Sequence, residues 1–124
     1  MSYVPRILSV EDDPDGQELV STILNHLSIP MDAAYSAEQA EQFLFSGGGP
    51  YSAIVIDLAL PEKDGWELLY AIQSNPSTQN IPCIAVTAYH NSKLREQALQ
   101  AGFSAYFPKP IDTNALAQQL AAMV

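Results

Sequence analysis

The sequence has a single cysteine, Cys83, so no disulfide can form within the chain. A lone cysteine fits a reducing compartment, and we expect a cytoplasmic protein. No apolar run is long enough to span a bilayer, and the N-terminus lacks the basic and apolar regions of a signal peptide. We therefore expect no association with a membrane.

Positive charge is also scarce. The chain carries 5 Lys and Arg residues against 14 Asp and Glu residues, and its formal net charge is −9. The cations are scattered and cannot form the basic stripe that nucleic acids require. Direct binding of DNA or RNA is therefore not expected, whereas an acidic chain favours cations or basic partner surfaces. The cations are Arg6, Lys63, Lys93, Arg95 and Lys109.

The remaining composition is that of a globular protein. Hydrophobic residues make up 48% and charged residues 15% of 124 residues, which suits one domain spanning residues 1–124. Five short apolar runs predict buried strands, because parallel strands covered on both faces are almost continuously hydrophobic. These runs are residues 6–10, 31–34, 53–56, 82–86 and 105–107.

Helical patterns separate the predicted strands. We expect the first helix to begin after the cap Asp13, and the second at Ser36, in a capping box with Gln39. The fourth covers residues 92–101 and ends at Gly102. The apolar faces expected to be buried are Val20, Ile23, Leu24 and Leu27; Ala40, Phe43 and Leu44; Leu68, Leu69 and Ile72; and Leu116, Leu120 and Met123.

Alternating strands and helices indicate an α/β fold with a parallel sheet and helices on both faces. Right-handed crossovers restrict the strand order, and five units suit the doubly wound, flavodoxin-like order 2-1-3-4-5 with five helices. This order is an assumption at this point. It places the first and third strands side by side where the order reverses, and ligands bind outside the carboxyl ends of strands at such a point.

Polar residues stand where four of the predicted strands end. Asp57 closes the third run, and the pair Glu11-Asp12, Thr87 and Lys109 follow the first, fourth and fifth runs. In the assumed order these side chains converge on one shallow crevice. We therefore treat them as one candidate site.

The crowded carboxylates favour a divalent cation, because they repel one another unless a cation or a proton intervenes. Mg²⁺ is typically held by one or two carboxylates and keeps several waters. The predicted ligands are Asp12, Asp57 and the backbone carbonyl of Ala59, with Glu11 binding directly or through water.

An aspartate can also act as a nucleophile toward phosphorus and form an aspartyl phosphate. Phosphoryl transfer then needs mainly positioning and neutralisation of charge on the phosphoryl oxygens. The ammonium group of Lys109 suits one oxygen, and the Thr87 hydroxyl can donate to another. Asp57 is the predicted phosphoacceptor.

Along essentially its whole length the chain resembles the receiver domains of response regulators from bacterial two-component systems. Each matching motif is weak alone, but their order and their positions on the predicted elements are specific. The motifs are Glu11-Asp12, Asp57 with Pro61 and Gly65, Thr87-Ala88, and Lys109-Pro110. Glu11 departs from the more frequent aspartate and lengthens one arm of the metal site.

The resemblance implies a phosphorylation-dependent switch. Asp57 would take its phosphoryl group from a histidine kinase or a histidine phosphotransfer protein, with Mg²⁺. Thr87 would move toward that group and Tyr106 would turn from exposed to buried. A downstream protein would dock on the surface formed by the fourth helix, fifth strand and fifth helix, and a homodimer could form there. The Lys109–Pro110 peptide is cis in this family.

Two other kinds of function remain open from the sequence. A phosphatase of the haloacid-dehalogenase type also uses an aspartate at a strand end, but it generally needs a second acid two residues later, where this chain has Ala59. A receiver-like interaction module that no longer uses phosphate would not need Asp57, Thr87 and Lys109 together. We expect a chain that phosphorylates and dephosphorylates itself and turns over no separate substrate.

Overall fold

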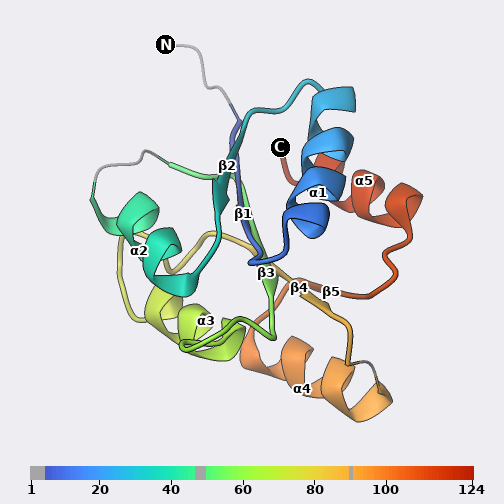
Figure 1. Cartoon of the computed structure of the whole chain (residues 1–124). Coiled ribbons are helices and arrows are strands. Elements are labelled where there is room, and N and C mark those ends of the chain that lie inside the picture. Colours follow the sequence, from blue (N-terminus) through green and yellow to red (C-terminus); the bar gives the residue numbers. More distant parts are fainter. Residues whose placement is uncertain (1–4, 47–49, 90) are drawn as a thin grey trace.

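The computed structural model describes residues 5–46, 50–89 and 91–124, within which five strands alternate with five helices (Figure 1). None of the described helices is long and apolar enough to cross a membrane. In chain order the elements are β1 (Ile7–Val10), α1 (Pro14–His26), β2 (Met31–Ala34), α2 (Ala37–Phe45), β3 (Ala53–Asp57), α3 (Gly65–Gln73), β4 (Cys83–Thr87), α4 (Ser92–Ala101), β5 (Ala105–Pro108) and α5 (Thr113–Ala122).

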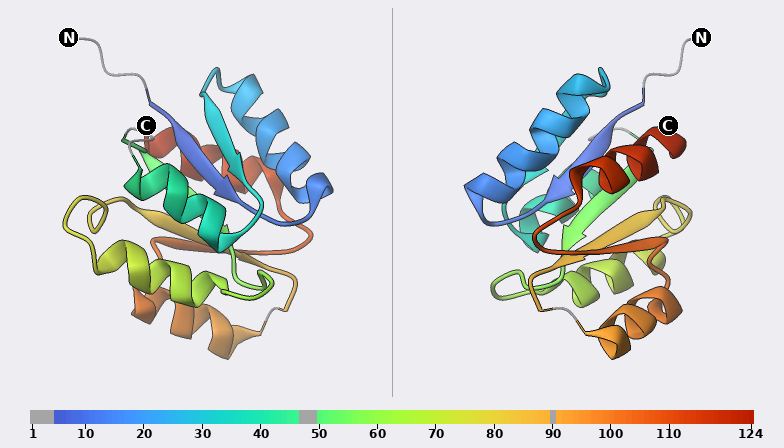
Figure 2. Two further views of the ribbon diagram at one scale, coloured as in Figure 1. Left: turned by 60° about the vertical axis from the view of Figure 1, so that its left-hand side comes forward. Right: turned by 90° about the vertical axis from the view of Figure 1, so that its right-hand side faces the viewer.

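The five strands form one parallel sheet in the order β2-β1-β3-β4-β5, which confirms the assumed topology. Helices α1 and α5 cover one face, and α2, α3 and α4 cover the other (Figure 2). Each face has its own buried cluster of aliphatic side chains, because strand residues point alternately to the two sides. The sheet is therefore buried on both faces between two layers of helices.

Three strands end one residue later than predicted, and in β3 and β4 the extra residue is a functional candidate. β3 ends at Asp57, which pairs with Val86, and β4 ends at Thr87, which pairs with Pro108. Ladder pairing with a neighbouring strand thus continues through the polar residue. Asp57 and Thr87 are held by the sheet itself, so their positions are more rigid than those of loop residues.

The predicted helix faces are buried with few differences. The predicted residues of α3 are fully buried, but Phe43 and Leu44 of α2 and Met123 after α5 are only partly covered. Helix α2 packs over β2, the edge strand, so part of its apolar face extends beyond the sheet. Periodicity alone predicts that the whole apolar face of α2 contacts the core, but the position of this helix at the sheet edge leaves part of that face uncovered.

Helix capping follows the sequence at most ends. Ser36 Oγ accepts a hydrogen bond from Gln39 N at 3.1 Å, but the reciprocal bond of the predicted capping box is absent there, because the Gln39 side chain accepts from Tyr35 N at 2.7 Å. A reciprocal capping box forms instead at α3, between Asp64 and Glu67. Helix α4 ends as predicted at a glycine with positive φ, Gly102 at 120°.

Candidate functional site

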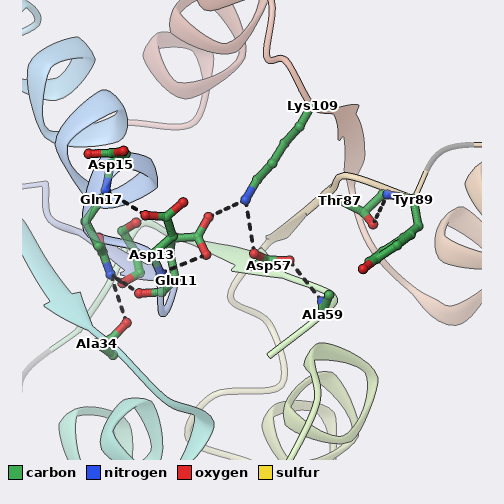
Figure 3. A network of polar contacts seen from close by, with 11 residues as sticks. Glu11, Asp13, Asp15, Gln17, Ala34, Asp57, Ala59, Thr87, Tyr89 and Lys109 are labelled. Carbon is green, nitrogen blue, oxygen red and sulfur yellow. Dashed lines mark hydrogen bonds and ion pairs between the residues drawn. The ribbon is translucent and has the colours of Figure 1, made fainter. Parts of the chain in front are cut away.

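The predicted site residues converge at the carboxyl ends of the strands (Figure 3). Glu11 and Asp12 follow β1, Asp57 and Thr87 end β3 and β4, and Lys109 follows β5. One carboxylate oxygen from each of the three acids lies within 4.8 Å of the others. The strand order brings these residues together from positions far apart in the sequence.

Lys109 contacts two of the acids. Its Nζ donates to Glu11 Oε1 at 2.5 Å and to Asp57 Oδ2 at 3.1 Å, and its backbone N–H donates to Thr87 O at 2.8 Å. Burial lowers the pKa of Lys109, but the hydrogen bond to Glu11 and the charge of Asp57 outweigh burial, so the pKa is raised overall. The ammonium group is therefore fixed between both carboxylates in its charged form.

The two buried carboxylates have opposite pKa shifts. Burial and its hydrogen-bonded neighbour Asp57 raise the pKa of Glu11 to about 7, although Lys109 opposes this. Burial also raises the pKa of Asp57, but Glu11, the backbone N–H of Ala59 and Lys109 lower it further, and the net shift is downward. Near neutral pH the pair therefore keeps Asp57 ionised, which is the form required of a nucleophile.

The donor set fits a hard divalent cation. Glu11 and Asp57 are buried, whereas Asp12 is exposed, so the cluster opens toward solvent on one side. Three carboxylates and an open side suit Mg²⁺, which binds oxygen ligands and keeps several waters. Ala59 N donates to Asp57 Oδ1 at 2.9 Å and so orients the phosphoacceptor. The Ala59 carbonyl as a metal ligand stays a prediction.

The two predicted switch residues lie on β4 and β5. Thr87 is buried with 1% of its surface exposed, and its Oγ1 accepts from Tyr89 N at 3.0 Å. Tyr106 is also buried, with 8% exposed. The Tyr106 ring belongs to the core cluster that includes Ala98 and Phe103, which is the buried one of the two positions that the resemblance implies, and its turn from exposed to buried stays a prediction. The predicted cis peptide at Lys109–Pro110 is present.

The sequence analysis overlooked Gln17. This buried side chain of α1 donates from Nε2 toward the carbonyl oxygens of Ser9, Glu11 and Ala34 at 2.9–3.0 Å. An amide nitrogen has two hydrogens, so the three acceptors share them. The contact ties α1 to the ends of β1 and β2 and fixes the backbone that carries the acidic pair. Gln17 is a polar residue on the inward face of a predicted helix, three residues before Val20, and this position is the signal that could have identified it.

Two glycines allow the site to close tightly. A Cβ at Gly16 would lie 2.4 Å from Glu11 Oε1, and a Cβ at Gly65 would lie 2.6 Å from the backbone oxygen of Asp57. Because glycine has no side chain, the first turns of α1 and α3 approach the acids more closely than they could with any other residue at these positions. Gly65 was identified from its motif, but nothing in the sequence marked Gly16.

A hollow of the described surface lies elsewhere. It has a volume of about 630 Å³ and runs between α1 and α5. Its walls are mainly apolar, with Asp15, Glu18 and His26 contributing polar atoms. None of the predicted site residues contributes to its walls, so the carboxylate cluster is a separate feature.

The fold and site together define a doubly wound α/β domain with a carboxylate–lysine cluster at the point where the strand order reverses. The family model of the response regulator receiver domain matches residues 7–121. The chain therefore belongs to the receiver domain family, whose members act in two-component signal transduction through phosphorylation.

Individual relatives include short proteins and parts of long ones. An uncharacterized 14.6 kDa protein of Leptolyngbya boryana is 37% identical over 106 residues, which cover 86% of this chain and 79% of that protein. The signal transduction histidine-protein kinase BarA of Escherichia coli K12 is 30% identical over 114 residues, which cover 89% of this chain and 12% of the kinase. The chain thus corresponds to only a small part of that kinase.

A solved structure supports the comparison at the site. The receiver domain of the sensor histidine kinase PA1611 of Pseudomonas aeruginosa PAO1 has a TM-score of 0.84 and 30% identity, with 98% of each chain covered. That structure is described with a magnesium ion coordinated in its active-site cleft.

Proposed function

We propose that Asp57 accepts a phosphoryl group from a phosphohistidine on a histidine kinase or a histidine phosphotransfer protein. The contact that best supports this is the bridge from Lys109 to Asp57 and Glu11, because it places an ammonium group beside an ionised, oriented aspartate. A carboxylate oxygen of Asp57 attacks phosphorus while the bond from phosphorus to the donor imidazole nitrogen breaks. The leaving nitrogen keeps the electron pair and takes up a proton.

Mg²⁺ fits the acidic cluster, where Asp12, Asp57, Glu11 and the Ala59 carbonyl would hold it. The ion would supply positive charge to the phosphoryl oxygens. Glu11 must then lose the proton that its raised pKa favours. Lys109 would shift from the carboxylates toward the phosphoryl group, because the ion takes over its role as countercharge.

The proposed output is a change in the surface formed by α4, β5 and α5. Thr87 would connect the site to this surface. Its hydroxyl oxygen accepts a hydrogen bond from Tyr89 N, and the hydroxyl can break this contact and donate to a phosphoryl oxygen instead. In α4, whose residues are all described, only Ala98 is buried, so few core contacts oppose its movement. A downstream protein or a second copy of the chain would bind the altered surface. Phosphorylation needs only to favour one of two pre-existing arrangements, with Thr87 and Tyr106 as the residues that change.

The alternatives have weaker support. A phosphatase of the haloacid-dehalogenase type generally needs a second acid two residues after its aspartate, and this chain has Ala59 at that position. A module independent of phosphate would have no use for the Lys109 bridge.

The buried, unreactive Cys83, whose pKa burial raises to about 12, agrees with the cytoplasm as the proposed location.

Intact-mass measurement after incubation with a small-molecule phosphodonor tests this function. We expect one phosphoryl adduct in the presence of Mg²⁺, none after its chelation, and none in Asp57→Asn. Asp15→Asn is the matched control, because Asp15 is an exposed acid of α1 outside the cluster, and it should behave as wild type. An adduct that persists in Asp57→Asn would contradict the proposal.

A further inference from the structure

Ser9 places a hydroxyl in an otherwise apolar part of the sheet. It lies in β1 with 1% of its surface exposed, and its Oγ has no hydrogen-bond partner within the described residues. A buried hydroxyl without a partner destabilises a protein, whereas an aliphatic residue at the same position would not. The structure therefore leaves a polar atom that requires a partner.

The position of Ser9 relates it directly to the phosphorylation site. Ser9 pairs in register with Val55 of β3, and the alternation of strand side chains places both on the sheet face covered by α1 and α5. Asp57 lies two residues beyond Val55 in β3 and Glu11 follows the end of β1, and both line the same small cavity as Ser9. The Ser9 hydroxyl is therefore located beneath the two buried carboxylates.

A small cavity connects these three residues. Its volume is about 10 Å³, which is room for about one water molecule. Its polar lining residues are Ser9, Glu11 and Asp57, and the rest of its lining is mainly aliphatic. The remaining lining residues are Val10, Gly16, Val20, Val55, Val86 and Ile111.

We propose that this cavity holds one ordered water, which accepts a hydrogen bond from Ser9 Oγ and donates to the carboxylates of Glu11 and Asp57. A hydroxyl can donate one proton, a water can donate two, and an ionised carboxylate only accepts. One water therefore satisfies the Ser9 hydroxyl and both acids together. An empty cavity of this size would instead leave the hydroxyl unpaired, and dry cavities are typically apolar.

The water makes Ser9 a positioning residue for the site. It supplies the carboxylates with a donor in addition to Lys109, and this donor remains when Lys109 turns toward a phosphoryl group. Hydrogen bonds from the water would fix the orientation of both carboxylates toward a bound cation. This effect on Mg²⁺ rests on the proposed function, whereas the presence of the water does not.

A crystal structure of the full metal-free chain, at a resolution that defines single waters, tests the site directly. We expect density for one water within hydrogen-bond distance of Ser9 Oγ and of at least one of the two carboxylates. An empty cavity, or a Ser9 hydroxyl that donates to a backbone carbonyl, would overturn the proposal.

Titration of variants with Mg²⁺ in a calorimeter tests the positioning role of Ser9. Ser9→Ala removes the hydroxyl and should weaken Mg²⁺ binding about three- to tenfold, as expected for the loss of one hydrogen bond between neutral groups. Ser9→Thr keeps the hydroxyl and should restore binding to within about twofold of wild type. Unchanged affinity in Ser9→Ala, with the water still in place, would overturn the role.

Thr78→Val is the matched control for the loss of a buried hydroxyl. Thr78 has 3% of its surface exposed and donates to Ile72 O at 2.7 Å, in the segment between α3 and β4 at the opposite end of the sheet. This variant should unfold more easily yet bind Mg²⁺ as wild type does. If wild type binds no Mg²⁺, the proposed function fails, and the crystallographic experiment still decides whether the water exists.

Discussion

Among single residues, Lys109 has the largest influence on the metal-free site. Its ammonium group contacts two buried acids that would otherwise repel each other. The same group is the one positioned to stabilise charge on a phosphoryl oxygen. In the proposed reaction Lys109 would therefore act as countercharge before phosphoryl transfer and as an electrostatic catalyst during it, and these two roles can be separated experimentally.

Lys109→Met should separate them. We expect adduct formation from a small phosphodonor to slow by about 10²-fold, the typical effect of removing one electrostatic contact to a transition state. Mg²⁺ affinity should rise, because the ion no longer competes with a positive group for the carboxylates. The time course of intact mass and a Mg²⁺ titration measure the two effects. Lys93→Met, at an exposed position of α4, is the control, and weaker Mg²⁺ binding in Lys109→Met would contradict the account.

The raised pKa of Glu11 predicts a pH dependence of stability. The ordinary pKa of Glu11 is 4.5 and its folded value is about 7, so its contribution to stability is complete below the first and is lost as pH rises through the second. Asp57, with a lowered pKa, contributes in the opposite sense and loses its contribution only in acid. Without Mg²⁺, the protein should therefore be less stable at pH 8 than at pH 5.5, by about 2 kcal/mol.

Chemical denaturation at the two pH values measures this difference. Glu11→Gln should show a much smaller decrease, because it has no proton to lose. Mg²⁺ should restore wild-type stability at pH 8, since the ion binds the ionised form. An equal decrease in wild type and Glu11→Gln would show that another group is responsible.

At the scale of elements, the site depends on how closely helices approach strand ends. Gly16 in α1 and Gly65 in α3 lie against the acids with no room for a side chain, and Gln17 ties α1 to the carbonyl groups at the ends of β1 and β2. These contacts hold the acids from the helix side, while ladder pairing holds Asp57 and Thr87 from the strand side.

Gly65→Ala tests this close approach. The added Cβ would meet the backbone oxygen of Asp57, which cannot rotate away, so α3 or the phosphoacceptor must shift. We expect a loss of about 1–3 kcal/mol in the free energy of unfolding and weaker Mg²⁺ binding, by analogy with overpacked cores. Calorimetry and chemical denaturation measure both.

Gly102→Ala is the comparison variant. It places alanine at a positive φ, and its Cβ would meet the end of the Gln73 side chain, far from the acids. Stability should decrease by about 1 kcal/mol, while Mg²⁺ binding stays unchanged. If Gly65→Ala also left Mg²⁺ binding unchanged, the helix contact would have no part in shaping the site.

At the scale of the whole molecule, the sequence predicted the alternation of strands and helices, whereas the strand order was an assumption that the structure confirms. Apolar runs ending in Asp57 and Thr87 predicted buried strands with polar ends, and the parallel order brought those ends together. Ser9, Gly16 and the burial of Tyr106 could not be predicted in this way. Each depends on the distance between elements after packing, which periodicity along the chain does not contain.

The same scale explains why the output surface can move. Helix α4 has few contacts with its neighbours: Ala98 is buried in the core, Leu94 is partly buried against it, and Gln73 Nε2 donates to Ala101 O at 3.0 Å. Helices α1 and α3 instead bury four residues each. The α4 end of the molecule is therefore the part whose arrangement phosphorylation can change at the lowest cost.

Amide hydrogen exchange with and without a phosphodonor and Mg²⁺ tests the central claim, that phosphorylation of Asp57 alters the α4, β5 and α5 surface. The account predicts changed exchange in Ser92–Ala101 and Ala105–Pro108, little change in α2 (Ala37–Phe45), and no change in Asp57→Asn. Intact mass of the same samples establishes that the adduct is present. A fully phosphorylated protein with unchanged exchange throughout the chain would contradict the switch.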